Sequence, residues 1–316
     1  VTFIQNLNKK MKKILFILSL CFILVSCGGD DDNGDPNAFN EPTTAGLSYS
    51  NSQSDFITTY NGIRATLQSN SNISVLAEVN HTANAQSVNQ SLRNTRIIFF
   101  GNPSLGTPVM QENQLAGLDL PQHILLYENA SSEVIASYNS VNYLSTRYGV
   151  QSANTLPQIE SALESIVNTT TQNEVLTNSS ASINSGQGVI TLVSQNNFST
   201  TYNNLRNSII DNTNLSLVFE LNHQENAQNA GLSLRPTSVI VFGNPNLGTP
   251  LMQDSQTTAL DLPQKFLVWE DENGEVKVSY NNPNFLKSRH LISNSQNSTL
   301  EDITNALNNL AISATN

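Results

Sequence analysis

Hydrophobic and polar positions along the chain change their period in a fixed order, and the changes predict strands and helices. In the second half, apolar runs typical of strands cover residues 189–195, 215–221 and 238–242. Two further runs, 266–270 and 276–280, flank Asp-Glu-Asn-Gly, which is typical of a hairpin turn. Helical spacing follows the first run and returns at the end of the chain, at residues Phe198, Tyr202, Leu205, Ile209, Leu300, Ile303, Leu307 and Leu310.

Shorter helices are predicted between these elements. Asn222 and Glu225 have the spacing of a capping box, and Thr249 with Pro250 has the pattern of an N-cap and a first helical residue. The resulting order is β-α-β-β-β-β-α. It predicts an α+β fold, with an antiparallel sheet and helices on one face.

The pattern occurs twice. Residues 56–150 align with residues 198–292 without a gap, and roughly half of the positions are identical. The closing helix recurs as Leu156, Ile159, Leu163 and Ile166. We therefore predict two repeat domains, 45–168 and 189–316, joined by a flexible linker, Thr169–Gly188, rich in Thr, Asn and Ser. The two repeats are expected to pair with each other as an internal pseudo-two-fold dimer.

The N-terminal segment resembles a bacterial export signal. Four lysines precede an apolar run, 14–25, that suits a signal peptide, and Leu-Val-Ser-Cys-Gly resembles a lipobox ending at Cys27. This resemblance implies that residues 1–27 are a signal peptide with lipobox, that Cys27 carries the lipid, and that the membrane is a partner through this anchor. Residues 28–44 are interpreted as a disordered acidic tether, either a spacer or a surface-export signal. We expect a cell-envelope location, as an outer-membrane lipoprotein.

Charge and cysteine content narrow the function classes. The chain has 14 Lys and Arg against 25 Asp and Glu, for a net charge of -11. Loss of the four lysines before Cys27 would bring it to about −15, so no basic surface for nucleic acid is expected. Both cysteines, Cys21 and Cys27, lie in the N-terminal segment, so the repeats have no thiol for a disulfide, catalysis or metal binding.

Four ordered blocks carry a family resemblance. They are Phe-Gly-Asn-Pro, Gly-Thr-Pro-x-Met, Leu-Asp-Leu-Pro and, in the second repeat, Val-Trp-Glu-Asp-x-x-Gly. In this order they resemble the domain of unknown function 302 family, over nearly all of both repeats. The resemblance implies a TATA-box-binding-protein-like β-α-β(4)-α fold, without implying DNA binding. It names no reaction and no cofactor.

Histidines recur at one equivalent position, His81 and His223, with Glu78 and Glu220 three residues earlier. On a regular strand such Glu and His side chains point to opposite faces, so the local sequence sets up no acid–base pair. A hydrogen-bonded histidine at a strand–helix junction is the favoured interpretation. A ligand-binding or proton-transfer role is the alternative.

Two other recurring charged positions are candidates. Asp119 and Asp261 precede Leu-Pro, and an Asp that caps a turn is favoured over one that carries chemistry. Arg147 and Arg289 are expected to form salt bridges with nearby acidic residues, in preference to binding an anion. No catalytic or metal-ligating set is predicted.

Three functions remain open at this point. The leading hypothesis is a non-enzymatic envelope module that binds a small ligand or an envelope partner. The second is an enzyme or a metal or haem binder that uses the repeated His, Glu and Arg positions, and the third is a purely structural surface protein. Convergence of His223, Glu220, Asp261 and Arg289 on one apolar pocket would favour the second. If a ligand binds, the second repeat is expected to dominate, because it keeps Trp269 and His290.

The anchor hypothesis makes a direct prediction. Replacing Cys27 with Ser removes the thiol that would receive the lipid, so Cys27→Ser should move the protein from the membrane fraction to the soluble fraction. Fractionation after a high-salt wash measures this. A variant that stays with the washed membranes would contradict the prediction.

Overall fold

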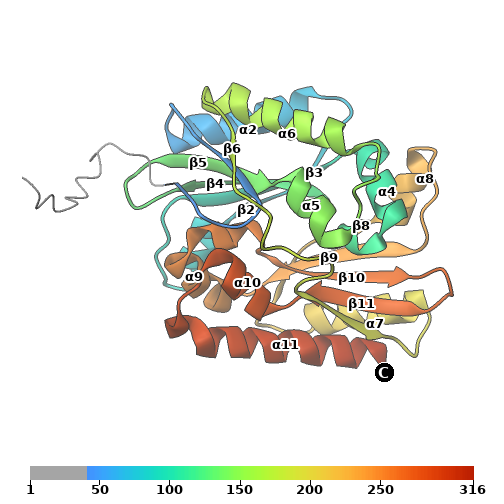
Figure 1. The fold of residues 1–316 in the computed structure, drawn as a ribbon. Coiled ribbons are helices and arrows are strands. Elements are labelled where there is room, and N and C mark those ends of the chain that lie inside the picture. The colour runs from blue at the N-terminus through green and yellow to red at the C-terminus, as the bar shows by residue number, and fades with distance from the viewer. Residues whose placement is uncertain (1–40) are drawn as a thin grey trace, which may run out of the picture. The chain divides into compact units, whose positions relative to one another are not determined.

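Each repeat builds one antiparallel sheet from the apolar runs of the sequence (Figure 1). The structure is a computed structural model, and it describes residues 41–316; the predicted signal peptide and most of the tether lie outside the described residues. The first sheet has the order β2-β3-β4-β5-β1-β6 and the second β7-β11-β10-β9-β8. The strands are β1 (Leu47–Asn51), β2 (Ser74–Asn80), β3 (Thr95–Gly101), β4 (Gln122–Glu128), β5 (Val134–Asn139), β6 (Leu176–Thr177), β7 (Val189–Val193), β8 (Ser216–Asn222), β9 (Thr237–Gly243), β10 (Gln264–Glu270) and β11 (Val276–Asn281).

Two long helices cover the outer face of each sheet, so the sheets lie between two helical layers (Figure 1). Each first helix has a side-chain N-cap, Asp55 or Asn197. Residues at the apolar positions of the predicted helices are buried, among them Leu205, Leu300 and Leu307. The helices are α2 (Phe56–Ser69), α6 (Leu156–Thr171), α7 (Phe198–Ile210) and α11 (Asn297–Thr315). The predicted α+β fold, with helices on one face of each sheet, is confirmed.

Shorter helices connect the strands. They are α3 (His81–Ser87), α4 (Pro103–Glu112), α5 (Val141–Tyr148), α8 (His223–Asn229), α9 (Pro245–Asp254) and α10 (Pro283–His290), with 3-10 turns η1 (Gln114–Leu118), η2 (Gln256–Leu260) and η3 (Asn294–Gln296). The predicted cap at Asn222 is confirmed, since its Oδ1 accepts the backbone N–H of Glu225.

The predicted start of α9 at Thr249 and Pro250 is wrong. This helix begins one turn earlier, at Pro245, with Asn244 as its N-cap, and Pro250 lies inside it. Asn244 Oδ1 accepts the backbone N–H of Asn246 at 3.0 Å, and proline suits the first helical position because it has no N–H to satisfy. The Asn-Pro pair therefore starts the helix before the Thr-Pro pair is reached.

The segment between the repeats was expected to be flexible, but it is packed in the structure. Helix α6 extends to Thr171, and β6 adds to the edge of the first sheet beside β1. Gly186 N–H donates to the carbonyl of Arg147, and Ile183 is buried. The end of the predicted tether is also packed, since Thr44 is buried and donates to Thr257 at 2.9 Å. These backbone groups find partners on the repeats, which explains why a polar composition does not leave the segments free.

The two repeats contact each other through matching elements. Turn η1 lies against β9 and β10, and η2 lies against β3 and β4. Gln114 Nε2 donates to Thr237 Oγ1 at 2.8 Å, and Gln256 Nε2 donates to Thr95 Oγ1 at 2.7 Å. One hydrophobic cluster also includes residues of both repeats, such as Leu118 and Leu267. The contacts of η1 and of Gln114 thus have counterparts with the repeats exchanged.

Within residues 41–316, no helix has the length and apolar character needed to cross a membrane.

Pairing of the repeats in solution can be measured by small-angle X-ray scattering on residues 41–316. Because a shared apolar cluster joins the repeats, we expect the profile of a single globule. A profile with two resolved lobes would contradict the pairing and would support two independent domains.

Candidate functional site

The recurring histidines lie where a strand passes directly into a short helix. His81 begins α3 after β2, and His223 begins α8 after β8. Asn80 and Asn222 cap these helices and end the strands. Each histidine is only 4% exposed, so its ring is removed from water. The predicted strand–helix junction is therefore where both histidines sit.

Each histidine reaches the other repeat. The backbone of Leu262 hydrogen-bonds to His81, and the backbone of Leu120 hydrogen-bonds to His223. In the described part of the chain Nε2 of neither ring has a partner, so these bonds use Nδ1 as the donor. Burial lowers the pKa of each histidine to about 4, against a smaller opposing effect of that hydrogen bond. Both rings are therefore neutral at pH 7, with an Nε2 that accepts hydrogen bonds.

Both histidines line pockets. The first-repeat pocket, of about 410 Å³, is formed mainly by β2, β3, α4 and α6, with His223 and Asn226 from the other repeat. The second-repeat pocket, of about 200 Å³, is formed mainly by β8, β9, α9 and α11, with His81 and Asn84 from the other repeat. Equivalent side chains line the two: Phe100, Met110, Ile159, Ala162 and Leu163 in one, and Phe242, Met252, Ile303, Ala306 and Leu307 in the other.

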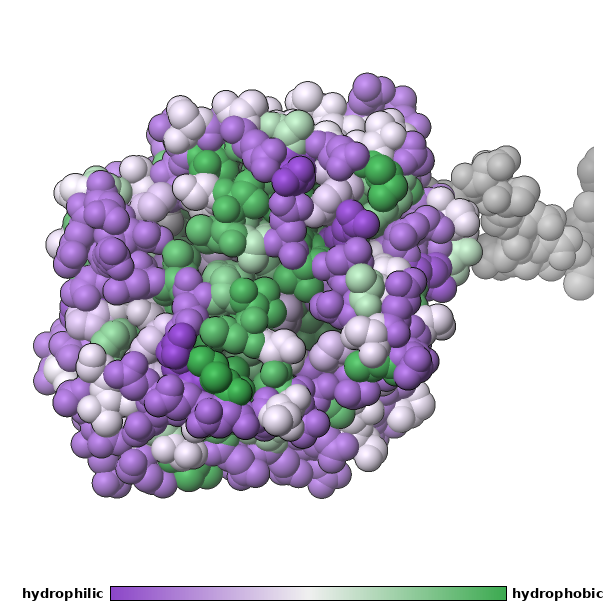
Figure 2. Space-filling model, turned by 180° about the vertical axis from the view of Figure 1, so that it is seen from behind, coloured by the Kyte–Doolittle hydropathy of each residue, from purple (hydrophilic) through white to green (hydrophobic). Residues whose placement is uncertain are grey.

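The pocket linings are mainly apolar, and they also contain neutral Asn, Gln, Ser, Thr and His side chains. Thr107 and Thr249 line the first-repeat and second-repeat pockets, and their buried Oγ1 atoms have no hydrogen-bond partner among the described residues. None of the described residues lining either pocket is Asp, Glu, Lys or Arg. Figure 2 shows apolar side chains gathered in a hollow on the face turned away from the viewer of Figure 1. Such linings suit an apolar molecule with few polar groups.

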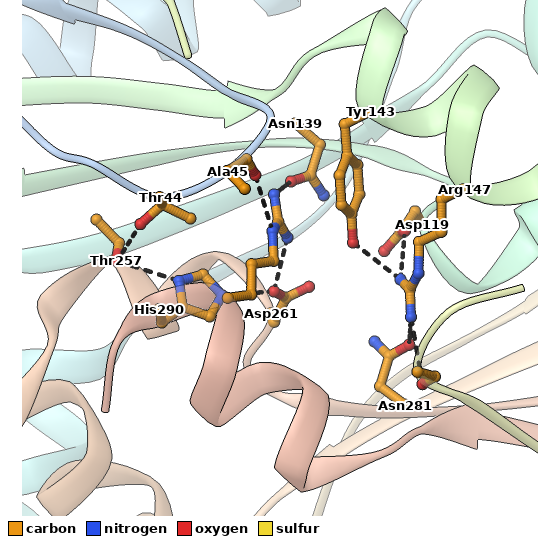
Figure 3. A network of polar contacts seen from close by, with 12 residues as sticks. Thr44, Ala45, Asp119, Asn139, Tyr143, Arg147, Thr257, Asp261, Asn281 and His290 are labelled. Carbon is orange, nitrogen blue, oxygen red and sulfur yellow. Dashed lines mark hydrogen bonds and ion pairs between the residues drawn. The ribbon is translucent and has the colours of Figure 1, made fainter. Parts of the chain in front are cut away.

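A second cluster of polar residues lies buried between the repeats (Figure 3). Arg147 Nη1 donates to Asp119 Oδ2 at 2.9 Å, within the first repeat. Its Nη2 donates to Asn281 Oδ1 of the second repeat at 2.8 Å. Tyr143 and Tyr148 also accept from Nη1. The ion pair is fully buried and is joined to the opposite repeat through Asn281.

The second repeat makes the exchanged arrangement. Arg289 Nη1 donates to Asp261 Oδ2 at 2.8 Å, and its Nη2 donates to Asn139 Oδ1 of the first repeat at 2.5 Å. His290 Nε2 lies 2.6 Å from the same Asp261 oxygen. Lys265 Nζ adds a contact of 3.6 Å to Asp119 Oδ1, across the repeats. We call these residues and their first-repeat counterparts the central cluster.

Charge balance holds the two carboxylates of the central cluster ionised. Burial opposes ionisation of Asp261, but Arg289 and the hydrogen bond from His290 outweigh it and hold its pKa well below the usual range. Burial likewise opposes ionisation of Asp119, and Arg147 and Lys265 lower its pKa. Salt bridges for Arg147 and Arg289 were predicted, and these residues form them. Asp119 and Asp261 do cap turns η1 and η2, through their backbone N–H groups, whereas their carboxylates bind arginine.

The predicted site residues do not converge. Glu78 accepts from Arg64 Nε at 2.8 Å and from Tyr60, while Glu220 makes the same bonds to Arg206 and Tyr202, all within one repeat. The glutamates therefore point away from the histidines, as their spacing predicted. Among residues 41–316, no three His, Cys, Asp or Glu side chains are placed to share a metal ion.

Sequence reasoning missed several residues of both sites. Thr107 and Thr249 belong to the repeated Gly-Thr-Pro block, in which Thr249 was predicted to cap a helix. Asn139 and Asn281 also recur, but only the packing of the repeats shows that each serves the other copy's arginine. Trp269 and His290, expected to favour the second repeat, line neither pocket.

The buried histidines predict a loss of stability in acid. His81 and His223 have a pKa of about 4 when folded and 6.5 when unfolded, so the unfolded chain binds more protons between these values. The free energy of unfolding should fall as the pH drops from 6.5 to 4, by roughly 2–3 kcal/mol per histidine. The ion pairs of Asp119 and Asp261 are expected to lower the free energy of unfolding further once the pH falls below 3.8, the pKa of these carboxyl groups in the unfolded chain.

Urea unfolding at several pH values measures this slope. The double variant His81→Leu, His223→Leu should show a shallower slope between pH 6.5 and 4, since two of the linked protons are gone. An unchanged slope would show that these histidines are not held neutral.

Comparison with known proteins places the chain in a family. The model for the domain of unknown function DUF302 matches residues 49–168 and 190–310. Two curated relatives, the fluoride-specific ion channels FluC 1 of Brucella suis biovar 1 and FluC 2 of Brucella melitensis biotype 1, are 46% identical over 76 residues, or 24% of this chain. That match spans 30% and 28% of their lengths.

A solved structure is also similar in part. The uncharacterized conserved protein DUF302 from Bacillus stearothermophilus is 18% identical, with a TM-score of 0.37, over 40% of this chain and 98% of its own. The family match falls on both repeats and covers more than half of the chain. The chain belongs to the DUF302 family and carries two copies of its domain.

Proposed function

We propose that this protein is a non-enzymatic binding module that holds a small, mainly apolar ligand in each of its two pockets. The observation that carries the proposal is the duplication of one pocket design. Each pocket is lined by apolar side chains, one threonine and one histidine, and the threonine Oγ1 and histidine Nε2 lack partners in the described chain. Buried polar atoms without partners destabilise a protein, so a ligand that satisfies them would be favoured.

The larger pocket supports a ligand of ordinary metabolite size. Small-molecule sites measure about 300–1,000 Å³. The first-repeat pocket, with about 410 Å³, falls in this range, and the second-repeat pocket, with about 200 Å³, is smaller. We expect the first-repeat pocket to bind more tightly. Its histidine is His223, so His223→Ala should weaken binding more than His81→Ala.

The enzyme hypothesis required the repeated acidic and basic residues to meet at the histidines. Glu220 pairs with Arg206, and Asp261 pairs with Arg289 in the central cluster, so neither lies among the residues that line a pocket. The histidines are thus left with an apolar environment, which suits binding better than proton transfer.

We further propose that the module is held at the cell envelope by a lipid on Cys27. The support is the sequence alone: a positive segment, an apolar run and a lipobox. Residues 28–40 would then connect the anchor to the first described residues. A tethered binding module would keep an apolar ligand near the membrane surface, from which such molecules partition.

Filling the pockets tests the binding proposal. Ala162 lies in the wall of the first-repeat pocket and Ala306 at the equivalent place in the second, and neither is buried. Ala162→Trp should abolish the tighter phase of binding of the neutral fluorophore N-phenyl-1-naphthylamine, and Ala306→Trp should abolish the weaker phase. Fluorescence titration of each variant gives affinity and stoichiometry.

Ser161→Trp is the matched control, because Ser161 is exposed on α6 outside the pocket lining and should leave both phases unchanged. Saturable binding that survives in the double variant Ala162→Trp, Ala306→Trp would refute the assignment of function to these pockets.

A further inference from the structure

The hydrogen bonds around the two histidines define what kind of polar group a pocket accepts. Nδ1 of His81 is committed as a donor to the carbonyl of Leu262, and Nδ1 of His223 to the carbonyl of Leu120. A neutral imidazole has one N–H, so Nε2 carries a lone pair and no proton. The unpartnered ring nitrogen of each pocket-lining histidine can therefore accept a hydrogen bond but cannot donate one.

The charges around the pockets exclude ions as good ligands. No acidic or basic side chain is among the described residues that line either pocket. A carboxylate, sulfonate or phosphate would lose its water without gaining a cation, and would also face the Nε2 lone pair. An ammonium group would find no carboxylate. The nearest buried charges described above, those of the central cluster, are already paired within it.

Each threonine offers a second polar contact. Thr107 and Thr249 are at most 1% exposed, and their hydroxyl groups have no partner among the described residues. A hydroxyl both donates and accepts, so it tolerates either group on a ligand. The histidine is the more selective of the two, because only its acceptor is free.

We propose that each pocket selects a neutral, apolar ligand with one N–H or O–H donor, and that the donor is recognised by the histidine of the opposite repeat. His223 accepts the hydrogen bond from the ligand in the first-repeat pocket, and His81 accepts it in the second-repeat pocket. Alcohols, phenols and secondary arylamines, which are neutral at pH 7, have this chemistry. The inference rests on the proposed function and adds the ligand class to it.

Three probes with one carbon skeleton test the selection on the full chain. N-phenyl-1-naphthylamine is neutral and has one N–H donor. Its N-methyl derivative has lost the donor, and 8-anilinonaphthalene-1-sulfonate keeps the N–H but adds an anion. We expect the N-methyl derivative to bind about tenfold more weakly than the parent amine, as the loss of one hydrogen bond predicts, and the sulfonate to bind more weakly still.

Leucine variants assign the preference to the histidines. His223→Leu should remove the preference for the N–H probe in the first-repeat pocket, and His81→Leu in the second, while the N-methyl derivative keeps its affinity. The affinity ratio of the two neutral probes is the readout, so a general change in pocket shape that weakens both does not mimic the result. Circular dichroism checks that the variants fold, and His223→Phe and His81→Phe serve as second replacements.

The outcomes separate the two proposals. Equal affinity for the amine and its N-methyl derivative, or tighter binding of the sulfonate at the pockets, would overturn the ligand class while leaving pocket binding intact. A preference that persists in the leucine and phenylalanine variants would also overturn it. Absence of saturable binding by all three probes would overturn the proposed function, and the ligand class with it.

Discussion

Two buried arginines, each shared between the repeats, are the constraint on which the arrangement of this protein depends. Arg147 and Arg289 are each neutralised by an Asp of their own repeat and completed by an Asn of the other. Removing one partner from a buried ion pair costs about 3–5 kcal/mol, because the remaining charge is left without compensation. The donors of each guanidinium are satisfied only when the repeats pack in this one register. Any other packing of the two repeats would leave a buried charge without a partner, which is why the central cluster fixes their relative position.

That register also determines where the histidines end up. Both lie at the end of an edge strand, β2 or β8, on the side of their repeat that meets the other copy. The backbone bonds to Leu120 and Leu262 then fix the imidazole rings against the opposite repeat. A pocket is therefore not a property of one domain: most of its lining comes from one copy and its histidine comes from the other. Separated repeats would each keep an apolar recess and lose its acceptor.

Much of the fold was predictable from the sequence, whereas the site was predictable only in its parts. Strand and helix periods predicted β7 to β11, α7 and α11 because each element buries one face against its own repeat. The prediction of a cap at Asn222 was also correct, because the bond to the N–H of Glu225 is local. The histidines, aspartates and arginines were recognisable by recurrence. Their partners were not, since Asn139, Asn281 and Lys265 act across the repeats, at separations that no local pattern encodes. The predictions of a disordered tether and a flexible linker were wrong for the same reason, because Thr44 and Ile183 are packed by contacts with residues distant in the sequence.

Joining two copies in one chain also explains why the centre of the molecule differs between repeats while the histidine and threonine of the pockets recur. Lys265 of the second repeat corresponds to His123 of the first. Burial lowers the pKa of His123, and the nearby charge of Lys265 lowers it further. Two lysines at these positions would bury like charges beside each other, as in any symmetric dimer, and repulsion in a poorly solvated interior is costly. A single chain can place a lysine on one side, against Asp119, and a neutral histidine on the other. The pockets have no charged side chain in their linings, so both can keep the same histidine and threonine without burying like charges.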